Sequence, residues 1–599
     1  MTREQKPFTK QDRLPFWPLA AVSVGVIAVL YVSSRFSIGR TPYRSVEILI
    51  VPALTALFMF PALVLARRVP PRAYARWRAH GVHPWLDRAW PAVIDAALLL
   101  TVWIAFGIAL QALWGIIDDH EIMLFLGEDG KLPLHEIPSW LMQTEVGAWG
   151  AHARYRPTYY LLRLLETAVW GKNPMLWYAC RVVLVGLAMV IWRRLVTGSL
   201  GKLGAAMLCM YTLTFPYWDE FTGRLGPSET YVIIGLPLYI AGVAAAVRAE
   251  WKRPLEKLLA NGAILVGAII CIGSKENLLL LTLPSAYLLV RAARRRDAML
   301  FASAAGSLLF GAFVAGSILF SVSKTGLDIY DKPVAVGLRL AEIVAVLRNR
   351  HVVTPFSMLV AVDFGVGALL LLPRWTRQQR NSIRRAAFWL ASLCLVFAAQ
   401  LVYYNADWPV TIMRYGYPGL LYYPASILIL YGLARDLLSG YTTEGAAQVA
   451  LRASLLASLV VVIIYHEGYA GAIRAMEANV ASTTEFTTRL ERLVERLNQD
   501  DRLQVVVESS STEDYEPVYG YPRFLRAYRI RNPMFLRLNG YSSDSFSEGL
   551  DRRLAAELEA TSSHGGSGYL PLSTLEEQPG RCLSIFLSSE YLTACEVFR

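Results

Sequence analysis

The chain has 599 residues, of which 55% are hydrophobic and 18% are charged, and its mean hydropathy is +0.37. Soluble domains carry about 25% charged residues, and several apolar runs here have the length of about 20 residues that a helix needs to cross a bilayer. The composition excludes an ordinary soluble protein and indicates an integral membrane protein.

The net charge of +12 does not indicate nucleic-acid binding, because of where the basic residues lie. Arginine-rich loops separate apolar runs at 66–78, 192–195, 291–296 and 374–385. Short basic loops of this kind are typical of the cytoplasmic side of membrane proteins. They predict a cytoplasmic N-terminus and favour topological anchoring over a nucleic-acid surface.

The apolar runs predict an all-α polytopic membrane domain of about thirteen transmembrane helices. Their centres lie near residues 24, 56, 102, 185, 207, 238, 266, 284, 310, 364, 396, 426 and 458. The first run, 14–32, is too long for a cleavable signal peptide and lacks a small-residue cleavage site. Residues 1–90 are interpreted as an extra N-terminal hairpin with a basic loop, and residues 91–466 as the main transmembrane domain.

A long polar connection, 117–174, follows the third predicted span. Its segments 134–149 and 156–170 are amphipathic at helical spacing. Amphipathic helices lie along a membrane surface rather than crossing it. We therefore expect this loop on the outer face, with two helices along the bilayer.

Residues 467–599 have normal polarity and predict a small soluble α/β domain. A charged helix at 486–499 precedes strand-like segments at 503–509 and 582–589. Because the number of spans is odd, this tail is expected on the periplasmic or extracellular side of the inner or plasma membrane. Cys582 and Cys595 bracket a predicted strand, turn and strand, and a disulfide between them needs an oxidising compartment.

Charged and polar residues gather at the predicted outer ends of the spans, where one external cavity can collect them. They are Asp118, Asp119, His120 and Glu121; Arg154 and Arg156; Asp219, Glu220 and Arg224; Lys275, Glu276 and Asn277; and Asp407, Trp408 and Arg414. Any one of these residues alone is more often an interfacial anchor.

Interfacial anchoring does not explain two of these groups. Asp118 and Asp119 repel each other as adjacent carboxylates, and such pairs are typical of acid–base sites. The polar segment 274–277 lies between two apolar spans, where burial is costly without a partner. A carboxylate can take a proton from an acceptor hydroxyl, while lysine and arginine neutralise a departing phosphate. These are the requirements of sugar transfer from a polyprenyl-phosphate carrier.

The chain resembles the GT-C class of integral membrane glycosyltransferases, which includes protein O-mannosyltransferases, lipid A aminoarabinose transferases and mycobacterial arabinosyltransferases. The resemblance covers about residues 91–599. It rests on the acidic pair 118–119 at the start of the first large external loop, the "RYRP" segment 154–157, the "KEN" sequence 275–277 and the α/β tail. The acidic pair follows the third span, whereas the class places it after the first.

The resemblance implies a general base in the acidic pair, with Asp119 slightly preferred to Asp118. It implies inverting transfer of a sugar from a polyprenyl-phosphate donor to a hydroxyl on envelope lipid, polysaccharide or protein. The donor phosphate is expected near Lys275, Arg154, Arg156 and Arg414. Candidate acceptor, sugar or supporting residues are His120, Glu121, Asp219, Glu220, Arg224, Glu276, Asn277, Asp407 and Trp408.

A metal requirement stays open at this point. If a divalent cation such as Mg²⁺ or Mn²⁺ takes part, Asp119, His120 and Glu121 are the candidate ligands. One histidine beside two acids is weak evidence for a metal site.

Three alternatives to this function stay open. A polysaccharide polymerase or O-antigen ligase uses pyrophosphate-linked donors and relies on arginines and a histidine in a large external loop. A lipid or glycolipid transporter predicts repeated halves and ionisable residues near mid-span, for which Asp95, Arg181 and Asp363 are the candidates. A catalytically inactive scaffold predicts that the acidic pair tolerates alanine. The expected partners are the bilayer, a lipid-linked donor and an acceptor, with no nucleic acid.

Overall fold

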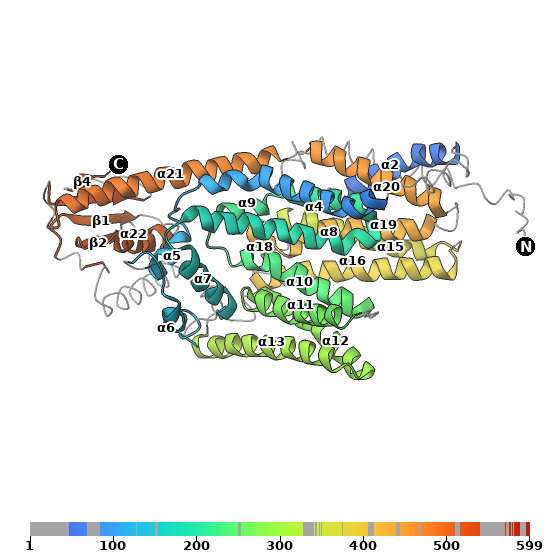
Figure 1. The fold of residues 1–599 in the computed structure, drawn as a ribbon, viewed down its shortest axis with the longest axis horizontal. Helices are drawn as coiled ribbons and strands as arrows, with labels where there is room; N and C mark the ends of the chain where they lie inside the picture. The colour runs from blue at the N-terminus through green and yellow to red at the C-terminus, as the bar shows by residue number, and fades with distance from the viewer. Residues whose placement is uncertain are drawn as a thin grey trace, which may run out of the picture. The chain divides into compact units, whose positions relative to one another are not determined.

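The computed structural model describes most of the chain (Figure 1). The described residues are 47–68, 84–126, 129–149, 154–248, 253–326, 350–373, 375–404, 413–438, 444–465, 469–509 and 515–538, with shorter stretches within 341–348 and 569–598. The chain forms two compact units. The first comprises 1–103, 186–218 and 335–472, and the second comprises 104–185, 219–334 and 473–599. The units interleave along the sequence, so the division expected at residues 90 and 466 stays a prediction.

Within the described residues, seven helices are long and apolar enough to cross a membrane. They are Ala89–Gln111, Pro174–Leu213, Glu229–Arg248, Pro254–Ile272, Ala298–Thr325 and Arg377–Leu401, together with Gln448–Gln499, of which 448–465 and 469–499 are described. The coarse prediction of a mostly helical, multi-pass membrane protein is confirmed.

Several predicted spans differ from these helices. The one near residue 24 lies outside the described residues, and those near 56 and 364 fall on shorter apolar stretches, Ile50–Met59 and Leu359–Leu371. The span near 284 is a 3-10 helix, η5 (Glu276–Leu281), followed by the 14-residue α12 (Thr282–Arg295). The span near 426 is the 17-residue α19 (Tyr422–Leu438). The helix near 284 is shortened because the polar segment 274–277 continues into η5.

The first unit is a set of apolar helices. It contains α2 (Glu47–Arg68), α15 (Arg350–Ala368), α16 (Arg377–Tyr404), α18 (Met413–Gly416), α19 and α20 (Glu444–Tyr465), together with most of α4 (Pro84–Phe106). Asp95 of α4 pairs with Arg193 Nε at 2.6 Å and with Arg194 Nη2 at 3.0 Å. The Asp95 carboxylate therefore joins α4 to the helix that contains Arg193 and Arg194.

The long helix α8 (Pro174–Leu213) is interrupted at Gly201, whose φ of 77° and ψ of 170° are not helical. Glycine adopts such a positive φ without steric cost. The interruption divides the 40 residues into two helical parts, which correspond to the spans predicted near 185 and 207.

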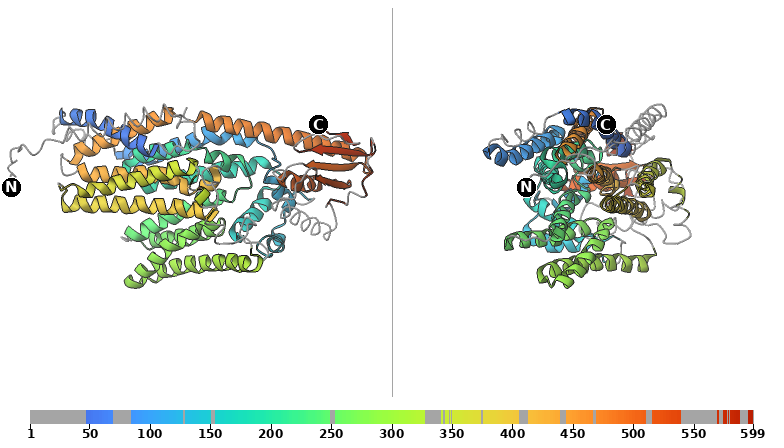
Figure 2. Two further views of the ribbon diagram at one scale, coloured as in Figure 1. Left: turned by 180° about the vertical axis from the view of Figure 1, so that it is seen from behind. Right: turned by 90° about the vertical axis from the view of Figure 1, so that its right-hand side faces the viewer.

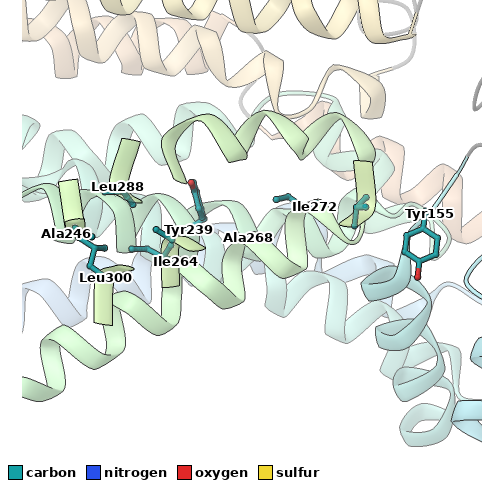
Figure 3. Packing of buried hydrophobic residues seen from close by; sticks show 11 residues of the cluster. Tyr155, Tyr239, Ala246, Ile264, Ala268, Ile272, Leu288 and Leu300 are labelled. Atoms are coloured by element: carbon teal, nitrogen blue, oxygen red, sulfur yellow. The ribbon is translucent and has the colours of Figure 1, made fainter. Parts of the chain in front are cut away.

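In the second unit, α10 (Glu229–Arg248), α11 (Pro254–Ile272), α12 and α13 (Ala298–Thr325) share a buried cluster (Figure 3). Tyr239, Ile264, Leu288 and Leu300 each contribute to it. Small residues let these helices approach closely: a Cβ atom on Gly267 would lie 2.6 Å from the backbone nitrogen of Tyr239.

The tail holds a four-stranded parallel sheet in the order β2-β1-β3-β4 (Figure 2). The strands are β1 (Gln504–Ser509), β2 (Met534–Leu538), β3 (Cys582–Phe586) and β4 (Glu596–Val597), and α22 (Tyr515–Ala527) connects β1 to β2. A parallel pair needs such a crossover. The expected α/β character is confirmed, but β3 and β4 pair in parallel rather than as two strands joined by a tight turn. Cys582 and Cys595 form a disulfide bond.

The long loop folds into short helices, α5 (Asp119–Leu126), α6 (Ile137–Met142) and α7 (Pro157–Trp170). The amphipathic segment predicted at 134–149 is helical only as far as Met142. Beyond it the chain turns, and the amide nitrogens of both Gly147 and Ala148 donate to the carbonyl of Thr144. Pro157 begins α7, where the absence of its N–H costs nothing.

Candidate active site

The acidic pair follows a short segment that is held by the long tail helix α21 (Ala470–Gln499). Thr483 Oγ1 accepts a hydrogen bond from the amide of Leu113 at 3.1 Å, and Thr487 Oγ1 donates to the carbonyl of Trp114 at 3.1 Å. Helix α5 then begins at Asp119. Two threonines one turn apart thus fix the backbone that leads into the acidic pair.

Asp118 has a left-handed backbone conformation, with a φ of 67°. Aspartate is one of the few residues with a side chain that visit this region, and such residues collect at functional sites. Asp118 Oδ2 lies 2.6 Å from Arg224 Nη2, and a fifth of the Asp118 side chain is exposed. Gly226 makes this approach possible, because a Cβ atom there would lie 2.0 Å from the Cβ of Asp118.

Asp119 is almost fully buried, and its Oδ2 accepts a hydrogen bond from the amide of Gly115 at 2.7 Å. Burial raises the pKa of Asp119 to about 7, aided by the neighbouring Asp118 charge and opposed by the Gly115 hydrogen bond. A carboxyl with such a pKa exchanges its proton near neutral pH. The adjacent carboxyls therefore have different environments.

His120 is also buried, and its surroundings keep it neutral. Burial lowers its pKa to about 3, and the nearby Arg523 charge acts in the same direction. Among the described residues its Nδ1 atom has no hydrogen-bond partner. His120 is therefore not an acid near neutral pH.

The hydroxyl of Tyr159 joins α5 to α7. It lies 3.0 Å from Glu121 Oε2 and 2.9 Å from the carbonyl of Gly226, and it accepts a hydrogen bond from Arg163 Nη2 at 3.2 Å. Burial raises the pKa of Tyr159. This tyrosine is a neutral connector between three parts of the second unit.

Arg163 was not predicted as a site residue, because it lies among leucines in an amphipathic segment. It is fully buried, and within the described structure its Nε and Nη1 atoms have no hydrogen-bond partner. Its positive charge lowers the pKa of Asp119, in opposition to burial. The guanidinium carbon lies 5.4 Å from the ring centre of Tyr159 and 5.7 Å from that of Trp177, so aromatic rings surround this buried charge.

The segment Ser274–Asn277 forms a turn between α11 and η5, and all four residues are buried. Lys275 Nζ lies 2.6 Å from Glu229 Oε1. The carbonyl of Gly273 accepts hydrogen bonds from the amides of Thr158 and Tyr159, at 2.9 and 3.0 Å. The N-terminus of α7 is therefore attached to this turn.

Arg156 is committed to a carboxylate of the protein. Its Nη2 and Nε atoms donate to Glu145 at 2.6 and 3.0 Å, and Nε lies 3.8 Å from Glu276 Oε1. Burial opposes the charge of Arg156, but Glu145 raises its pKa well above the usual value. The residue holds the loop to the turn, and this role competes with the phosphate contact predicted for it.

Three oxygen atoms of the buried turn lack a hydrogen-bond partner among the described residues. They are Ser274 Oγ, Glu276 Oε1 and Asn277 Oδ1. Buried polar groups of native proteins are nearly always satisfied. All three atoms can accept hydrogen bonds, and the Ser274 hydroxyl can also donate one.

One short segment connects the acidic pair to the lysine turn. Arg224 at one end pairs with Asp118, and Glu229 at the other pairs with Lys275. Five residues of fully extended chain span at most about 18 Å. The Cα atoms of Arg224 and Glu229 are therefore at most about 18 Å apart, and both charged groups are attached to this segment of the second unit.

The other predicted residues are distributed as follows. Asp219 and Glu220 lie in α9 (Tyr217–Gly223), just before Arg224, and Arg154 is half-buried ahead of α7. Arg414 belongs to the first unit, with its guanidinium 5.0 Å from the ring centre of Tyr415. Asp407 and Trp408 lie outside the described residues.

The proposed metal ligands do not form a metal site. In the part of the chain that the structure describes, no three His, Cys, Asp or Glu side chains are grouped to hold an ion. Asp119, His120 and Glu121 are consecutive residues of one helix, so their side chains point in different directions around it. Glu121 instead contacts Tyr159, and Asp119 accepts from Gly115.

The buried Arg181 has a structural partner in the same unit. Its Nη1 and Nη2 atoms donate to Glu166 at 2.6 and 2.8 Å, and Tyr231 donates to the same carboxylate at 2.6 Å. Burial opposes ionisation of Glu166, but the charge of Arg181 lowers its pKa. Asp95 is similarly paired within the first unit, so both of these mid-span charges are neutralised in place.

A cavity of about 470 Å³ lies apart from these groups, beside the tail sheet. It is lined by Glu485, Thr488, Arg489 and Arg492 of α21 and by Phe586, Val597 and Phe598. None of the predicted site residues lines it.

Comparisons with known proteins give a distant likeness to a solved structure. No family model matches the chain, and no curated protein matches it. The fold is similar to the crystal structure of ArnT from Cupriavidus metallidurans bound to undecaprenyl phosphate, with a TM-score of 0.39 and 12% identity, over 78% of this chain and 88% of that chain. A likeness this distant assigns no activity, and function has to come from the side chains of the chain itself.

Proposed function

We propose that the chain is a membrane glycosyltransferase that moves a sugar from a polyprenyl-phosphate donor to an acceptor hydroxyl on envelope lipid, polysaccharide or protein. The observation that carries this proposal concerns the segment 224–229. Arg224 at its start pairs with the partly exposed Asp118, and Glu229 at its end pairs with the buried Lys275. Glycosyl transfer from a lipid phosphate needs a proton acceptor and a cation on the two sides of one sugar.

Asp118 is the better general base of the pair. Its side chain is partly exposed, whereas Asp119 is enclosed and bonded to the amide of Gly115. A general base has to reach the proton that it removes. Asp118 takes the proton of the acceptor hydroxyl, and the freed oxygen pair attacks the anomeric carbon. The bond from that carbon to the phosphate oxygen breaks, with inversion, and the phosphate leaves with the electron pair.

Lys275 is the cation that receives the phosphate. An ammonium group has three N–H donors, and the Lys275 ammonium, buried beside Glu229, places a positive charge at this turn. Preorganised cations in a water-poor site stabilise charge as it develops. Arg163 adds a second buried positive charge to the region, and Arg156 holds the turn in place through Glu145.

The unsatisfied oxygens of the turn fit the sugar rather than the lipid. Glu276 Oε1 and Asn277 Oδ1 accept hydrogen bonds, and Ser274 Oγ donates or accepts. Sugar hydroxyls supply donors and acceptors in close spacing. A site built to bond a hydroxyl rejects analogues that lack it, so these residues are proposed to select the donor sugar.

Two observations disfavour the alternatives. The ligase alternative relies on arginines and a histidine of the large external loop, and the first histidine of that loop, His120, is buried, which lowers its pKa to about 3. The transport alternative relies on ionisable residues near mid-span, of which Asp95 and Arg181 are held in ion pairs, whereas Asp363 Oδ1 has no hydrogen-bond partner among the described residues.

The proposed site faces the periplasm or extracellular space, opposite the arginine-rich loops. The disulfide of the tail supports this orientation, because such bonds persist in oxidising compartments. No metal contact is assigned to the described residues.

Transfer by the purified full chain tests the proposal. The protein in lipid nanodiscs is offered a panel of radiolabelled polyprenyl-monophosphate and polyprenyl-pyrophosphate sugars, and release of polyprenyl phosphate is measured. Asp118→Asn should abolish transfer while the protein stays folded. Asp129→Asn, at a side chain that is 88% exposed, is the matched control. Full transfer by Asp118→Asn, or transfer from pyrophosphate donors alone, would refute it.

A further inference from the structure

Helix α22 of the tail packs directly against α5, which begins at the acidic pair (Figure 1). Gly520 permits the contact, because a Cβ atom there would lie 3.3 Å from the carbonyl oxygen of Ile116 and 3.6 Å from the Cβ of His120. The tail therefore meets the segment that presents the proposed base, in addition to holding it through α21.

The first turn of α22 places Glu516 beside Asp118. Glu516 Oε2 accepts a hydrogen bond from the amide of Asp118 at 3.1 Å and lies 3.9 Å from Arg224 Nη2. The same nitrogen lies 2.6 Å from Asp118 Oδ2. One guanidinium group thus stands between two carboxylates from parts of the chain that are 398 residues apart.

The amide contact explains how Asp118 keeps its unusual backbone. The amide of Asp118 is partly buried, and a buried or half-buried N–H needs a partner. Glu516 supplies this partner, and a hydrogen bond to a charged acceptor is stronger than one to a neutral acceptor. The position of the Asp118 side chain therefore depends on Glu516.

The charge of Glu516 matters during the reaction. When Asp118 accepts a proton it loses its charge, and Arg224 would lose its carboxylate partner. Glu516 remains as an anion beside Arg224, so the guanidinium stays compensated throughout the step. The two carboxylates also repel each other, which makes the shared arginine necessary.

We infer that Glu516 is a positioning residue of the transferase, supplied by the tail, that fixes Asp118 and shares Arg224 with it. The inference rests on the proposed function. It makes the tail a part of the active site rather than a separate binding module.

The groups that face Asp118 come from three elements. Asp119 and His120 follow it on α5, Arg224 follows α9, and Glu516 lies on α22, from which Arg523 acts on the neighbouring His120. Changing Glu516 alters one negative charge in this set and leaves the others in place. A shift of the kcat pH profile in a Glu516 variant can therefore be assigned to the loss of that one charge.

Steady-state kinetics of the full chain in nanodiscs test the inference. Glu516→Ala removes both the hydrogen bond and the charge, and should lower kcat about 10- to 100-fold with donor KM nearly unchanged. Glu516→Gln keeps an oxygen that accepts from the Asp118 amide and should lower kcat less. In Glu516→Gln the acidic limb of the kcat profile should move to lower pH, because a carboxylate that repels the Asp118 anion is gone. Glu495→Gln, at an exposed residue of α21, is the control.

The outcomes separate the inference from the function on which it rests. If Asp118→Asn is inactive while both Glu516 variants match the wild type in kcat and pH profile, the inference is wrong and the proposed function stands. If Asp118→Asn is active, the proposed function itself fails. If Glu516→Ala does not fold, the test rests on Glu516→Gln. An unchanged kcat together with an unchanged acidic limb of its pH profile would then overturn the inference.

Discussion

The ammonium nitrogen of Lys275 lies 2.6 Å from Oε1 of Glu229, and less than a tenth of either side chain is exposed. Breaking a buried ion pair by removing one partner leaves an uncompensated charge, whereas replacing both partners by apolar residues is often tolerated. A single variant and a double variant can therefore separate the contribution of Lys275 to protein stability from its contribution to phosphate binding.

The variant Lys275→Met should lower the free energy of unfolding by about 3–5 kcal/mol, because Glu229 then stays buried without a cation. It should also weaken binding of polyprenyl phosphate. In the double variant Lys275→Met/Glu229→Met, stability should recover while binding does not. Thermal unfolding and lipid-phosphate binding by calorimetry check both points. Recovery of binding in the double variant would show that Lys275 does not contact the phosphate.

Asp119 and His120 should make opposing contributions to the pH dependence of stability. The pKa of Asp119 is raised from 3.8 to about 7, so the folded state holds this proton more tightly and loses stability as pH rises from 3.8 to about 7. The pKa of His120 is lowered from 6.5 to about 3, so the folded state loses stability as pH falls from 6.5 to about 3. The wild type should vary little between these limits.

Single variants should expose each contribution. Asp119→Asn leaves His120, and unfolding midpoints should fall on acidification below pH 6.5. His120→Gln leaves Asp119, and midpoints should rise on acidification below pH 7. Midpoints measured from pH 4 to 8 check the signs, with Asp129→Asn as a control that should match the wild type. If the unfolding midpoints of the two variants changed in the same direction with pH, the opposing roles of Asp119 and His120 would be wrong.

Gly226 should be required for the placement of Asp118. In Gly226→Ala the new methyl group meets the Asp118 side chain, because an ideal Cβ lies 2.0 Å from Asp118 Cβ. Turnover should fall at least about 10-fold while the helical content is retained, since positional errors of about 1 Å at a catalytic group cost this much or more. Gly262→Ala, in α11 with nothing within 4 Å of its Cβ position, is the control and should keep full turnover.

The sequence predicted the features that depend on local pattern. Apolar runs of bilayer length identified α10, α11 and α13, and short apolar runs rich in β-branched residues identified β1 and β3. The acidic pair and the turn at Lys275 were recognised because polar residues are expensive in apolar surroundings. Each of these signals is contained in fewer than about 25 residues.

Contacts between distant segments were not predictable from one sequence. From the sequence, Glu516 is an ordinary acidic residue in the first turn of a helix. No local pattern indicates that it contacts Asp118. Glu229 is likewise an acid at a helix start, and only the tertiary fold brings it to Lys275. Arg163 resembles a surface arginine on an amphipathic helix until its burial is known. The parallel pairing of β3 with the two-residue β4 also lies beyond periodicity.

The disulfide should report the orientation of the tail in cells. Cys582 lies in β3 and Cys595 just before β4, and they are bonded to each other, whereas Cys180, Cys209, Cys271 and Cys394 are free thiols. If the tail lies outside the cytoplasm, an impermeant reductant added to intact cells should open the bond. An impermeant maleimide should then label the peptides that contain Cys582 and Cys595, with little labelling of either before reduction. Labelling of both cysteines only after cell lysis would place the tail in the cytoplasm, and would remove the external site from the proposed function.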